Sequence, residues 1–400
     1  MVKLKFFRFF LIGSFLLIGL SCTKGGGSQD IVIPTLKIEN GSQTRGVSAT
    51  AMQFQLTLTK ITTVPVSVNY VLTDGTALAS KDYVAASGTV TIDAGKALGE
   101  LIVMIKGDPT NTRQANPEFK VQLSNPKNCT LGSSSAKGTI ITEDGTNLTT
   151  DNTGYATPTS YPGMSLTWSD EFSENAPDMN AWNFEIGNGG NGWGNNELEY
   201  YTNSGKNVFL SNGNLIIEAR KETIGNFNYS STRMTTQNKK SFKFGRIDIR
   251  AKLPVTKGMW PALWMLGSNI SSMPWPKCGE IDIMELVGLD PKKVQGTGHF
   301  ASSAGVHDSR GGGYSLSSED FSQKFHVFSI LWAQDSITWL VDDKPFYTMT
   351  KASAGTDNYP FNNDFFFIFN VAVGGDWPGA PDGTTNFPQR MFVDYVRVFQ

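Results

Sequence analysis

The chain is poor in cysteine and in charge of either sign. Its 400 residues include three cysteines, too few and too scattered for a disulfide framework or a zinc site. Cys129 and Cys278 fall in regions that we expect to fold separately, so both are predicted to be buried free thiols. Basic residues number 34 and acidic residues 36, and no basic patch is interleaved with aromatics. Nucleic acid is therefore not an expected partner.

Long apolar runs are also scarce, with one exception at residues 9–20, directly after three basic residues. This pattern is typical of a secretory leader and is too short for a transmembrane helix. The run ends at Cys22, where the sequence is similar to a bacterial lipobox, although an ordinary leader with a chance cysteine is the alternative. We predict a signal peptide over 1–21, lipidation of Cys22 and a flexible tether over 22–30. The expected protein is an exported lipoprotein of the bacterial outer membrane. Whether it is displayed on the cell surface or on the periplasmic face is left open.

The composition that remains favours an all-β protein. Glycine numbers 41, aromatics make up 12% of the chain and charged residues only 18%, which indicates many turns and few helices. A polar stretch over 146–160 lacks hydrophobic periodicity and is predicted to be a linker. It separates a first region, 31–145, from a second region, 161–400.

The first region alternates apolar and polar residues in short runs such as 64–72, 88–92 and 101–105, which predict strands. Together with the segments 119–124 and 138–144, it resembles the Calx-β domain, which implies a small immunoglobulin-like sandwich. Some Calx-β domains bind calcium through clustered acids. Acidic residues are sparse here, so a spacer or accessory module is favoured over a calcium site.

The most informative segment of the second region spans residues 279–285 and reads GEIDIME. A strand would place Glu280 and Asp282 on one face, and a bulge near Met284 would return Glu285 to that face. Carboxylates among large apolar residues are rarely buried unless they are paired or functional. A salt-bridged strand face is the alternative, but no nearby basic run supplies the partners. Paired carboxylates on one concave face are what hydrolysis of a glycosidic bond requires.

Tryptophans cluster near this segment. Trp260 and Trp264 lie upstream in a block that reads GMWPALWML, and either can be core or a platform for sugar rings. Trp275 lies between two prolines, and Trp377 lies in a glycine-rich segment. A tryptophan on a loop is harder to explain as core, so these two favour sugar binding.

Several motifs in this order resemble glycoside hydrolase family sixteen, and within it the bacterial laminarinases. They lie at 168–172, 192–202, 244–247, 258–266, 279–285, 296–299, 370–375 and 393–398. The resemblance implies a β-jelly-roll with an open cleft and endo-acting, retaining hydrolysis of β-linked glucan. It also implies that Glu280 is the nucleophile, that Glu285 is the general acid and then the base, and that Asp282 positions Glu280.

The resemblance extends to residues that would bind substrate or metal. It places His299 in the catalytic cleft and Arg233 along the sugar subsites, with a surface salt bridge as the alternative for Arg233. Asn196 is expected to line the cleft, whereas Glu197 has an equal structural explanation. A structural calcium on the convex face would use Glu171, Gly213 and Asp394, and catalysis would need no cofactor.

The expected substrate is a neutral β-1,3-glucan of laminarin type, acted on by a monomer. The spacing Glu-x-Asp-x-x-Glu has one residue more than mixed-linkage lichenases, although agarases and carrageenases share it. Hydrolysis of β-1,3-1,4-glucan or galactan, and transglycosylation, therefore remain alternatives. Alternatives of another class are a non-catalytic glucan-binding lectin and a scaffold lipoprotein, and the three intact carboxylates argue against both.

Overall fold

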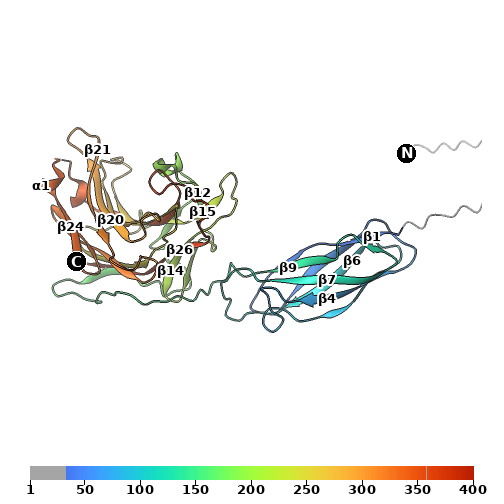
Figure 1. Ribbon diagram of the computed structural model, residues 1–400. Helices are drawn as coiled ribbons and strands as arrows, with labels where there is room; N and C mark the ends of the chain where they lie inside the picture. Colours follow the sequence, from blue (N-terminus) through green and yellow to red (C-terminus); the bar gives the residue numbers. More distant parts are fainter. Residues whose placement is uncertain (1–32, 357) are drawn as a thin grey trace, which may run out of the picture.

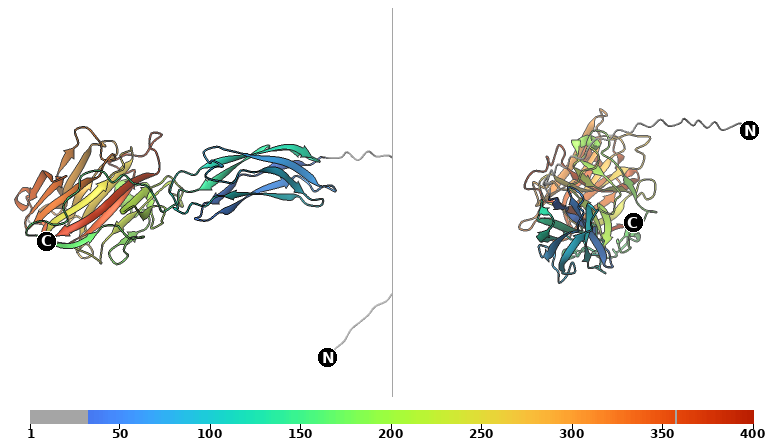
Figure 2. Two further views of the ribbon diagram at one scale, coloured as in Figure 1. Left: turned by 90° about the horizontal axis from the view of Figure 1, so that it is seen from below. Right: turned by 90° about the vertical axis from the view of Figure 1, so that its right-hand side faces the viewer.

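The protein consists of two β-sandwiches joined end to end (Figure 1), as a side view also shows (Figure 2). This computed structural model describes residues 33–356 and 358–400. The predicted leader, Cys22 and the tether lie outside the described residues. The all-β prediction is confirmed, since helix among the described residues is limited to α1 (Lys351–Ala354) and two short turns, η1 (Gly192–Asn196) and η2 (Pro360–Asn362). Within the described ranges, none of these helices has the length and apolarity to cross a membrane.

The first sandwich packs a four-stranded sheet, in the order β6-β3-β1-β8, against a five-stranded sheet, in the order β2-β9-β7-β4-β5. In β3 every second residue from Met52 to Leu58 is buried, and this alternation builds one face of the core. The three expected strand runs correspond to β4, β5 and β6. The strands are β1 (Thr35–Ile38), β2 (Gly41–Thr44), β3 (Thr50–Leu58), β4 (Val66–Thr73), β5 (Ser87–Ile92), β6 (Leu98–Ile105), β7 (Glu118–Lys127), β8 (Thr130–Leu131) and β9 (Ser135–Ile141).

Residues 146–160 form no strand, yet they are hydrogen bonded along the second sandwich. The Tyr155 amide donates to the Phe325 carbonyl at 2.9 Å, and Arg250 donates to the carbonyls of Asn152 and Tyr155. Farther along, the Thr157 amide donates to the Tyr395 hydroxyl at 2.9 Å. These contacts attach the segment to the back of the second sandwich.

The second sandwich has a back sheet of eight strands and a cleft sheet of seven. The back sheet runs β13-β14-β26-β17-β22-β23-β24, with β10 also paired to β26, and the cleft sheet runs β11-β16-β25-β18-β19-β20-β21. A separate pair, β12 (Glu199–Tyr201) and β15 (Tyr229–Ser231), lies beside them. The back strands are β10 (Leu166–Asp170), β13 (Val208–Ser211), β14 (Asn214–Ala219), β17 (Gly245–Lys252), β22 (His326–Ala333), β23 (Ser336–Val341), β24 (Lys344–Thr350) and β26 (Gln389–Phe399). The cleft strands are β11 (Asn183–Glu185), β16 (Arg233–Thr235), β18 (Met259–Gly267), β19 (Glu280–Glu285), β20 (Lys293–Ala301), β21 (His307–Ser315) and β25 (Phe365–Val373).

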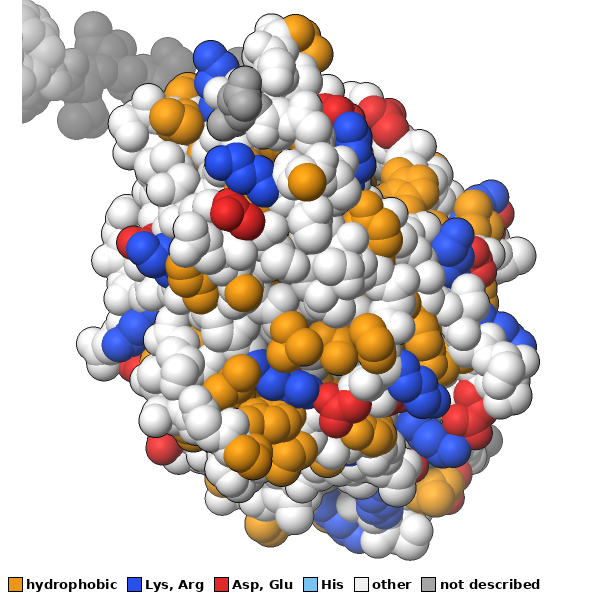
Figure 3. Space-filling model, turned by 90° about the vertical axis from the view of Figure 1, so that its left-hand side faces the viewer, with side chains coloured by type: hydrophobic (Ala, Val, Ile, Leu, Met, Phe, Trp, Pro, Cys, Tyr) orange, Lys and Arg blue, Asp and Glu red, His pale blue; other side chains and the backbone are white. Residues whose placement is uncertain are grey.

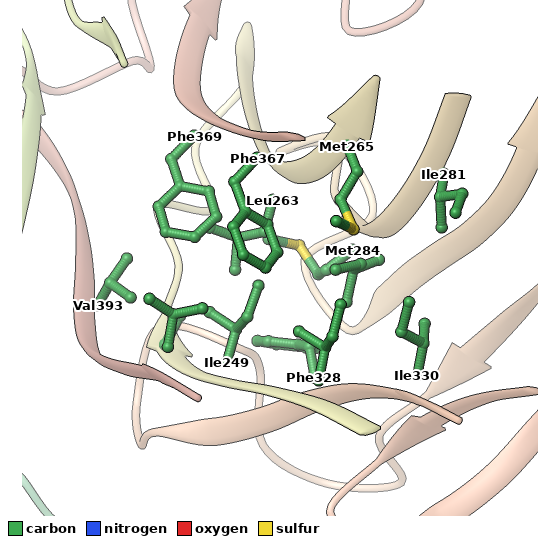
Figure 4. Close-up of a cluster of buried hydrophobic side chains, with 14 of the residues drawn as sticks. Ile249, Leu263, Met265, Ile281, Met284, Phe328, Ile330, Phe367, Phe369 and Val393 are labelled. Carbon is green, nitrogen blue, oxygen red and sulfur yellow. The ribbon is translucent and has the colours of Figure 1, made fainter. Parts of the chain in front are cut away.

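The core of this domain lies between the two sheets (Figure 4). Ile249, Phe328 and Val393 of the back sheet face Leu263 and Phe369 of the cleft sheet. Burial of each such side chain stabilises the fold by roughly 1.5–3 kcal/mol. Because alternate residues of the cleft sheet enter this core, the residues between them are presented on its outer face.

The predicted free thiols are confirmed, since Cys129 and Cys278 are both buried and unpaired. On the end of the second sandwich seen in Figure 3, acidic and basic side chains are interspersed with apolar ones.

Candidate active site

A β-bulge in β19 sets the three carboxylates of this strand on one side. The pairing of β19 with β18 skips Ile283, and its pairing with β20 is irregular between Asp282 and Glu285. Ile283 and Met284 consequently both enter the core, and Glu285 returns to the cleft face with Glu280 and Asp282. The predicted bulge near Met284 is confirmed.

These carboxylates line a cleft of about 370 Å³ on the outer face of the cleft sheet. Figure 1 shows the sheet rising toward β21 on one side and toward β12 and β15 on the other. Indole rings, carboxylates, one guanidinium and small residues share the lining, which suits the mixed apolar and hydroxylated surface of a sugar. The lining residues are Trp193, Gly194, Asn195, Glu197, Arg233, Trp260, Ala262, Trp264, Leu266, Trp275, Glu280, Asp282, Glu285, Asn370 and Ala372.

All three carboxyl groups of β19 hold protons to unusually high pH. Burial raises the pKa of Glu280, Asp282 and Glu285, each to about 8. The charge of Asp282 raises the pKa of both glutamates further, whereas His299 acts in the opposite direction. At neutral pH the group therefore retains protons, which a general acid requires.

His299 lies against β19 and contacts a second histidine on its other side. Its Nε2 is 3.1 Å from Asp282 Oδ2 and 3.8 Å from Glu280 Oε1. Its Nδ1 is 2.8 Å from His307 Nε2, and the two rings stack at 5.0 Å. The His307 ring also packs against Trp275 at 4.7 Å. His307 thus connects the acidic group to one tryptophan of the cleft wall.

Trp260 binds one of the β19 carboxyls directly. Its indole Nε1 donates a hydrogen bond to Glu285 Oε1 at 3.1 Å, and this bond lowers the pKa that burial raises. Trp377 packs edge-on against the Trp260 ring at 5.6 Å and is 44% exposed. It does not belong to the lining of the enclosed cleft and flanks it through Trp260.

Arg233 is buried between two aromatic rings. Its guanidinium lies 4.3 Å from the Trp193 ring and 4.8 Å from the Trp264 ring, and its Nε donates to Glu185. The salt bridge weighed as an alternative therefore exists, but it lies inside the cleft wall. Stacked and paired in this way, Arg233 fixes the position of Trp264 beside the catalytic strand.

The structure places Asn195, rather than the predicted Asn196, in the cleft lining. Asn196 has φ of 57° and donates to Asp376 at 2.9 and 3.1 Å, outside the lining. Because η1 is a one-turn π-helix and not a strand, its residues do not alternate in two directions. Glu197 does line the cleft and accepts hydrogen bonds from Asn195 and Tyr201.

The three residues expected at a calcium lie at one region of the back sheet. Asp394 belongs to β26, Gly213 precedes β14 and Glu171 follows β10, and both of these strands pair with β26. Both oxygens of Glu171 accept from Arg397, at 2.8 and 2.7 Å, and Asp394 accepts from Arg250 at 2.7 Å. Arg397 and Arg250 therefore already neutralise the two carboxylates that would attract a calcium ion. Calcium binding at this place stays a prediction.

Among the described residues, one group of three histidine or carboxylate side chains is close enough to share a metal ion. It comprises Glu280, Asp282 and His299, whose ligand atoms lie within 4.8 Å of one another. Burial raises the pKa of both carboxyls, which favours binding of protons by this group.

Sequence reasoning did not assign Trp193, Asn195, His307 or Asn370 to the site. Asn370 carried a usable signal, because it is the one polar residue in the otherwise apolar β25. His307 carried none, since its position depends on the pairing of β20 with β21.

Buried carboxyls with raised pKa values, in a cleft walled by indole rings, define a carbohydrate-cleaving hydrolase of the two-carboxylate type. The comparisons agree with this class. The sequence profile of glycosyl hydrolases family 16 matches residues 195–397, and that of the Calx-beta domain matches residues 33–145. A profile of beta-glucan synthesis-associated proteins matches residues 103–273, across both sandwiches. The chain belongs to glycosyl hydrolases family 16.

Three relatives illustrate the match. The chain is 41% identical over 249 residues to a beta-glucanase of Rhodothermus marinus, covering 60% of this chain and 86% of that protein. It is 40% identical over 268 residues to glucan endo-1,3-beta-glucosidase A1 of Niallia circulans, covering 62% of this chain and 39% of that protein. The chain thus spans about two fifths of the second relative. The laminarinase catalytic domain of Thermotoga maritima is 51% identical with a TM-score of 0.56, covering 59% of this chain and 98% of that domain.

Proposed function

We propose that the protein is an endo-acting, retaining hydrolase of β-1,3-glucan of the laminarin type. The observation that carries the proposal is the bulged strand β19, which presents Glu280, Asp282 and Glu285 together to the cleft. Two further facts support it: the one-residue-longer acidic spacing, and relatives named as laminarinase and endo-1,3-beta-glucosidase.

In the proposed reaction Glu280 attacks the anomeric carbon while Glu285 donates its proton to the departing glycosidic oxygen. The bond to the leaving sugar breaks as the bond to the Glu280 carboxylate forms. Glu285, now ionised, then takes a proton from water, and the hydroxide released attacks the same carbon and frees Glu280. Retention requires the two carboxyls to approach to roughly 5–5.5 Å in the working complex.

The residues around Glu280 and Glu285 support these two roles. His299 and Arg233 both lower the pKa of Glu280, opposing the burial that raises it, which favours the ionised nucleophile. Asp282 lies between the two glutamates, 3.1 Å from His299, and in this scheme it orients that ring and shares its charge with the pair. Trp260 holds one oxygen of Glu285 and leaves the other free to carry the proton.

The test compares Glu280→Gln and Glu285→Gln with the unaltered protein on laminarin. Loss of the acid should lower reducing-sugar release by about 10²–10⁴-fold, and loss of the nucleophile by at least as much. Both variants should unfold at the same temperature as the parent or higher at pH 7. The reason is that a raised pKa stabilises the fold below about pH 4.3 and that contribution is lost as pH rises toward 8.

The substrate is tested with a panel of laminarin, curdlan, lichenan, agarose and carrageenan. Release of short products from laminarin and curdlan is expected, with the β-anomer formed first by NMR. Release from agarose alone would redirect the substrate to a galactan, and products longer than the substrate would indicate transglycosylation. Binding of laminarin without any cleavage would show a glucan-binding protein instead.

We also propose that the protein is exported and anchored by acylation of Cys22, and that it is a monomer. Metabolic labelling with a fatty acid should mark the protein and fail to mark Cys22→Ala, which should leave the membrane fraction. Recovery of Cys22→Ala in the membrane fraction would contradict the anchor. Light scattering of the chain without its leader tests the monomer.

A further inference from the structure

Two buried carboxyl groups in the cleft wall have no part in the proposed reaction. Glu197 follows η1 and Glu199 begins β12, so both side chains point to the same side of an extended segment. Glu199 is fully buried and Glu197 is 6% exposed. Arg233, which lines the same cleft, pairs with Glu185 instead.

The hydrogen bonds around the two carboxyls leave one oxygen unexplained. Glu197 Oε1 accepts from Asn195 at 3.3 Å, and Glu197 Oε2 accepts from the Tyr201 hydroxyl at 2.9 Å. Glu199 Oε2 accepts from the Val373 amide at 2.6 Å. Glu199 Oε1 is buried without a donor, and burial and the charge of the nearby Glu197 carboxyl raise the pKa of Glu199. Two carboxylates cannot bond each other without a proton between them.

A continuous chain of donors leads from the cleft to this pair. Trp264 Nε1 donates to Asn370 Oδ1 at 2.8 Å, and Asn370 Nδ2 donates to the Tyr201 hydroxyl at 3.0 Å. Tyr201 in turn donates to Glu197. Every bond in the chain points toward one anion, the Glu197 carboxylate, and this direction fixes the orientation of the Asn370 amide.

We propose that Glu199 is held as a neutral carboxylic acid that donates its proton to Glu197. The resulting acid–carboxylate pair is a positioning device that holds Tyr201, Asn370 and the Trp264 platform in place. Its effect on sugar binding rests on the proposed function, whereas the proton itself does not.

The surroundings assign the proton to Glu199 rather than to Glu197. Glu197 receives two other hydrogen bonds and borders the cleft, so it suits the charged member. Burial, followed by the charge of Glu197, raises the pKa of Glu199 well above its usual range. The other titratable and charged groups around the pair are Tyr201 and the Arg233–Glu185 ion pair, and Tyr201 remains neutral because burial raises its pKa.

Glu199→Gln is the decisive variant, because its amide oxygen can accept from Val373 and its amide hydrogen can donate to Glu197. The infrared difference between parent and variant at pH 7 should contain the carbonyl band of a buried carboxylic acid. From about pH 4.3 upward, the unfolding equilibrium constant of the parent should rise relative to Glu199→Gln by about tenfold per pH unit. Absence of the band together with parallel pH dependences would overturn the proposal.

Glu197→Gln is the matched control, and it should be less stable than Glu199→Gln because it removes the anion to which the chain of donors points. If Glu197→Gln were instead the more stable of the two variants, the proton would belong to Glu197. The assignment of the proton to Glu199 would then be overturned. These readouts need no substrate, so they stand even if the proposed activity fails. On a cleaved substrate, Glu199→Gln should keep kcat and KM within about twofold, whereas Glu199→Ala should raise KM more than it lowers kcat. Unchanged kinetics and unchanged tryptophan fluorescence in Glu199→Ala would show that the pair does not position Trp264.

Discussion

Buried carboxylates occur on both sheets of the second sandwich, and the groups that face them differ. Glu218 of the back sheet is fully buried and is contacted by Arg113 at 3.1 Å and by Arg220 and Arg390 at 2.6 Å each. Glu280 of the cleft sheet has, in the part of the chain that the structure describes, a single basic partner, His299 at 3.8 Å. Strand alternation turns both side chains away from the core that Ile217 and Ile281 enter, so strand position alone does not distinguish a structural carboxylate from a reactive one.

The comparison teaches that the carboxyls of β19 are distinguished by the direct guanidinium contacts that they lack, although Arg233 lines the same cleft. Surrounded by guanidinium groups, Glu218 fulfils the rule that buried charges are paired. Without such partners, burial raises the pKa of Glu280 and Glu285 to about 8, so the pair retains a proton at neutral pH, as the proposed acid Glu285 requires.

Glu218 also joins the two domains, because Arg113 belongs to the segment after β6 of the first sandwich. Besides Glu218, Arg113 donates to the carbonyls of Gly205 and Lys206 and lies 4.0 Å from the Phe209 ring. The carboxylate of the back sheet therefore stabilises the docking of the first sandwich, whereas those of the cleft sheet destabilise their own domain at neutral pH.

The largest expected effect comes from removing the paired carboxylate. Glu218→Ala leaves buried arginines without a counter-ion and should lower the free energy of unfolding by about 3–5 kcal/mol. Urea denaturation measures it, and Glu280→Gln is the control in which stability at pH 7 should be unchanged or higher. Activity per folded molecule should stay at the parent level in Glu218→Ala. Equal stability of Glu218→Ala and the parent would break the contrast between the two sheets.

A smaller effect should follow from changing the indole donor that faces Glu285, the proposed general acid. Trp260→Phe removes the hydrogen bond that stabilises ionised Glu285, so the pKa of Glu285 rises further. The acid then stays protonated to higher pH, and the alkaline limb of the kcat/KM profile should move upward. The profile between pH 5 and 10 measures this shift, and Trp377→Phe is the control, because it changes the flanking ring and leaves that hydrogen bond intact. A limb that moves downward, or shifts equally in both variants, would contradict the assignment of Glu285.

Much of the arrangement of the cleft carboxylates could be predicted from the sequence, because the spacing of apolar residues along a strand indicates which side chains are buried. The alternation within residues 279–285 predicted a strand, and the surplus apolar residue predicted its bulge. The strands expected at 64–72, 88–92 and 101–105 of the first region are present for the same reason. A carboxylate in an apolar strand without basic neighbours already indicated that it is unpaired.

What the sequence could not reveal depends on the register between distant strands. Trp260 looked like a stacking platform, but the pairing of β18 with β19 brings its indole N–H to Glu285. Arg233 lines the cleft, but its contacts there with two rings and Glu185 depend on strands far apart in the sequence. Asn196 was displaced by its neighbour because a π-turn follows no strand alternation.

The smallest effect concerns His307, and it tests how the carboxyls of β19 are held without an arginine in direct contact. His299 Nε2 faces Asp282, and in the neutral ring that donates from this nitrogen, Nδ1 of His299 carries no proton. The Nδ1 atom of His299 must then accept a hydrogen bond from Nε2–H of His307. His307→Ala removes that donor at a cost of about 1 kcal/mol, which corresponds to a loss in kcat of about fivefold. It also removes the ring against which Trp275 packs, so KM should rise.

His307→Gln can restore a donor to His299 but not the aromatic contact, so it should recover kcat while KM stays raised. Nitrogen NMR of His299 reports its tautomer without any substrate, and the tautomer should be mixed in His307→Ala and single in the parent and in His307→Gln. If His307→Ala keeps a single tautomer of His299 and the kcat of the parent, then Asp282 alone orients His299. The unpaired carboxyls of the cleft would then need no support beyond their own strand.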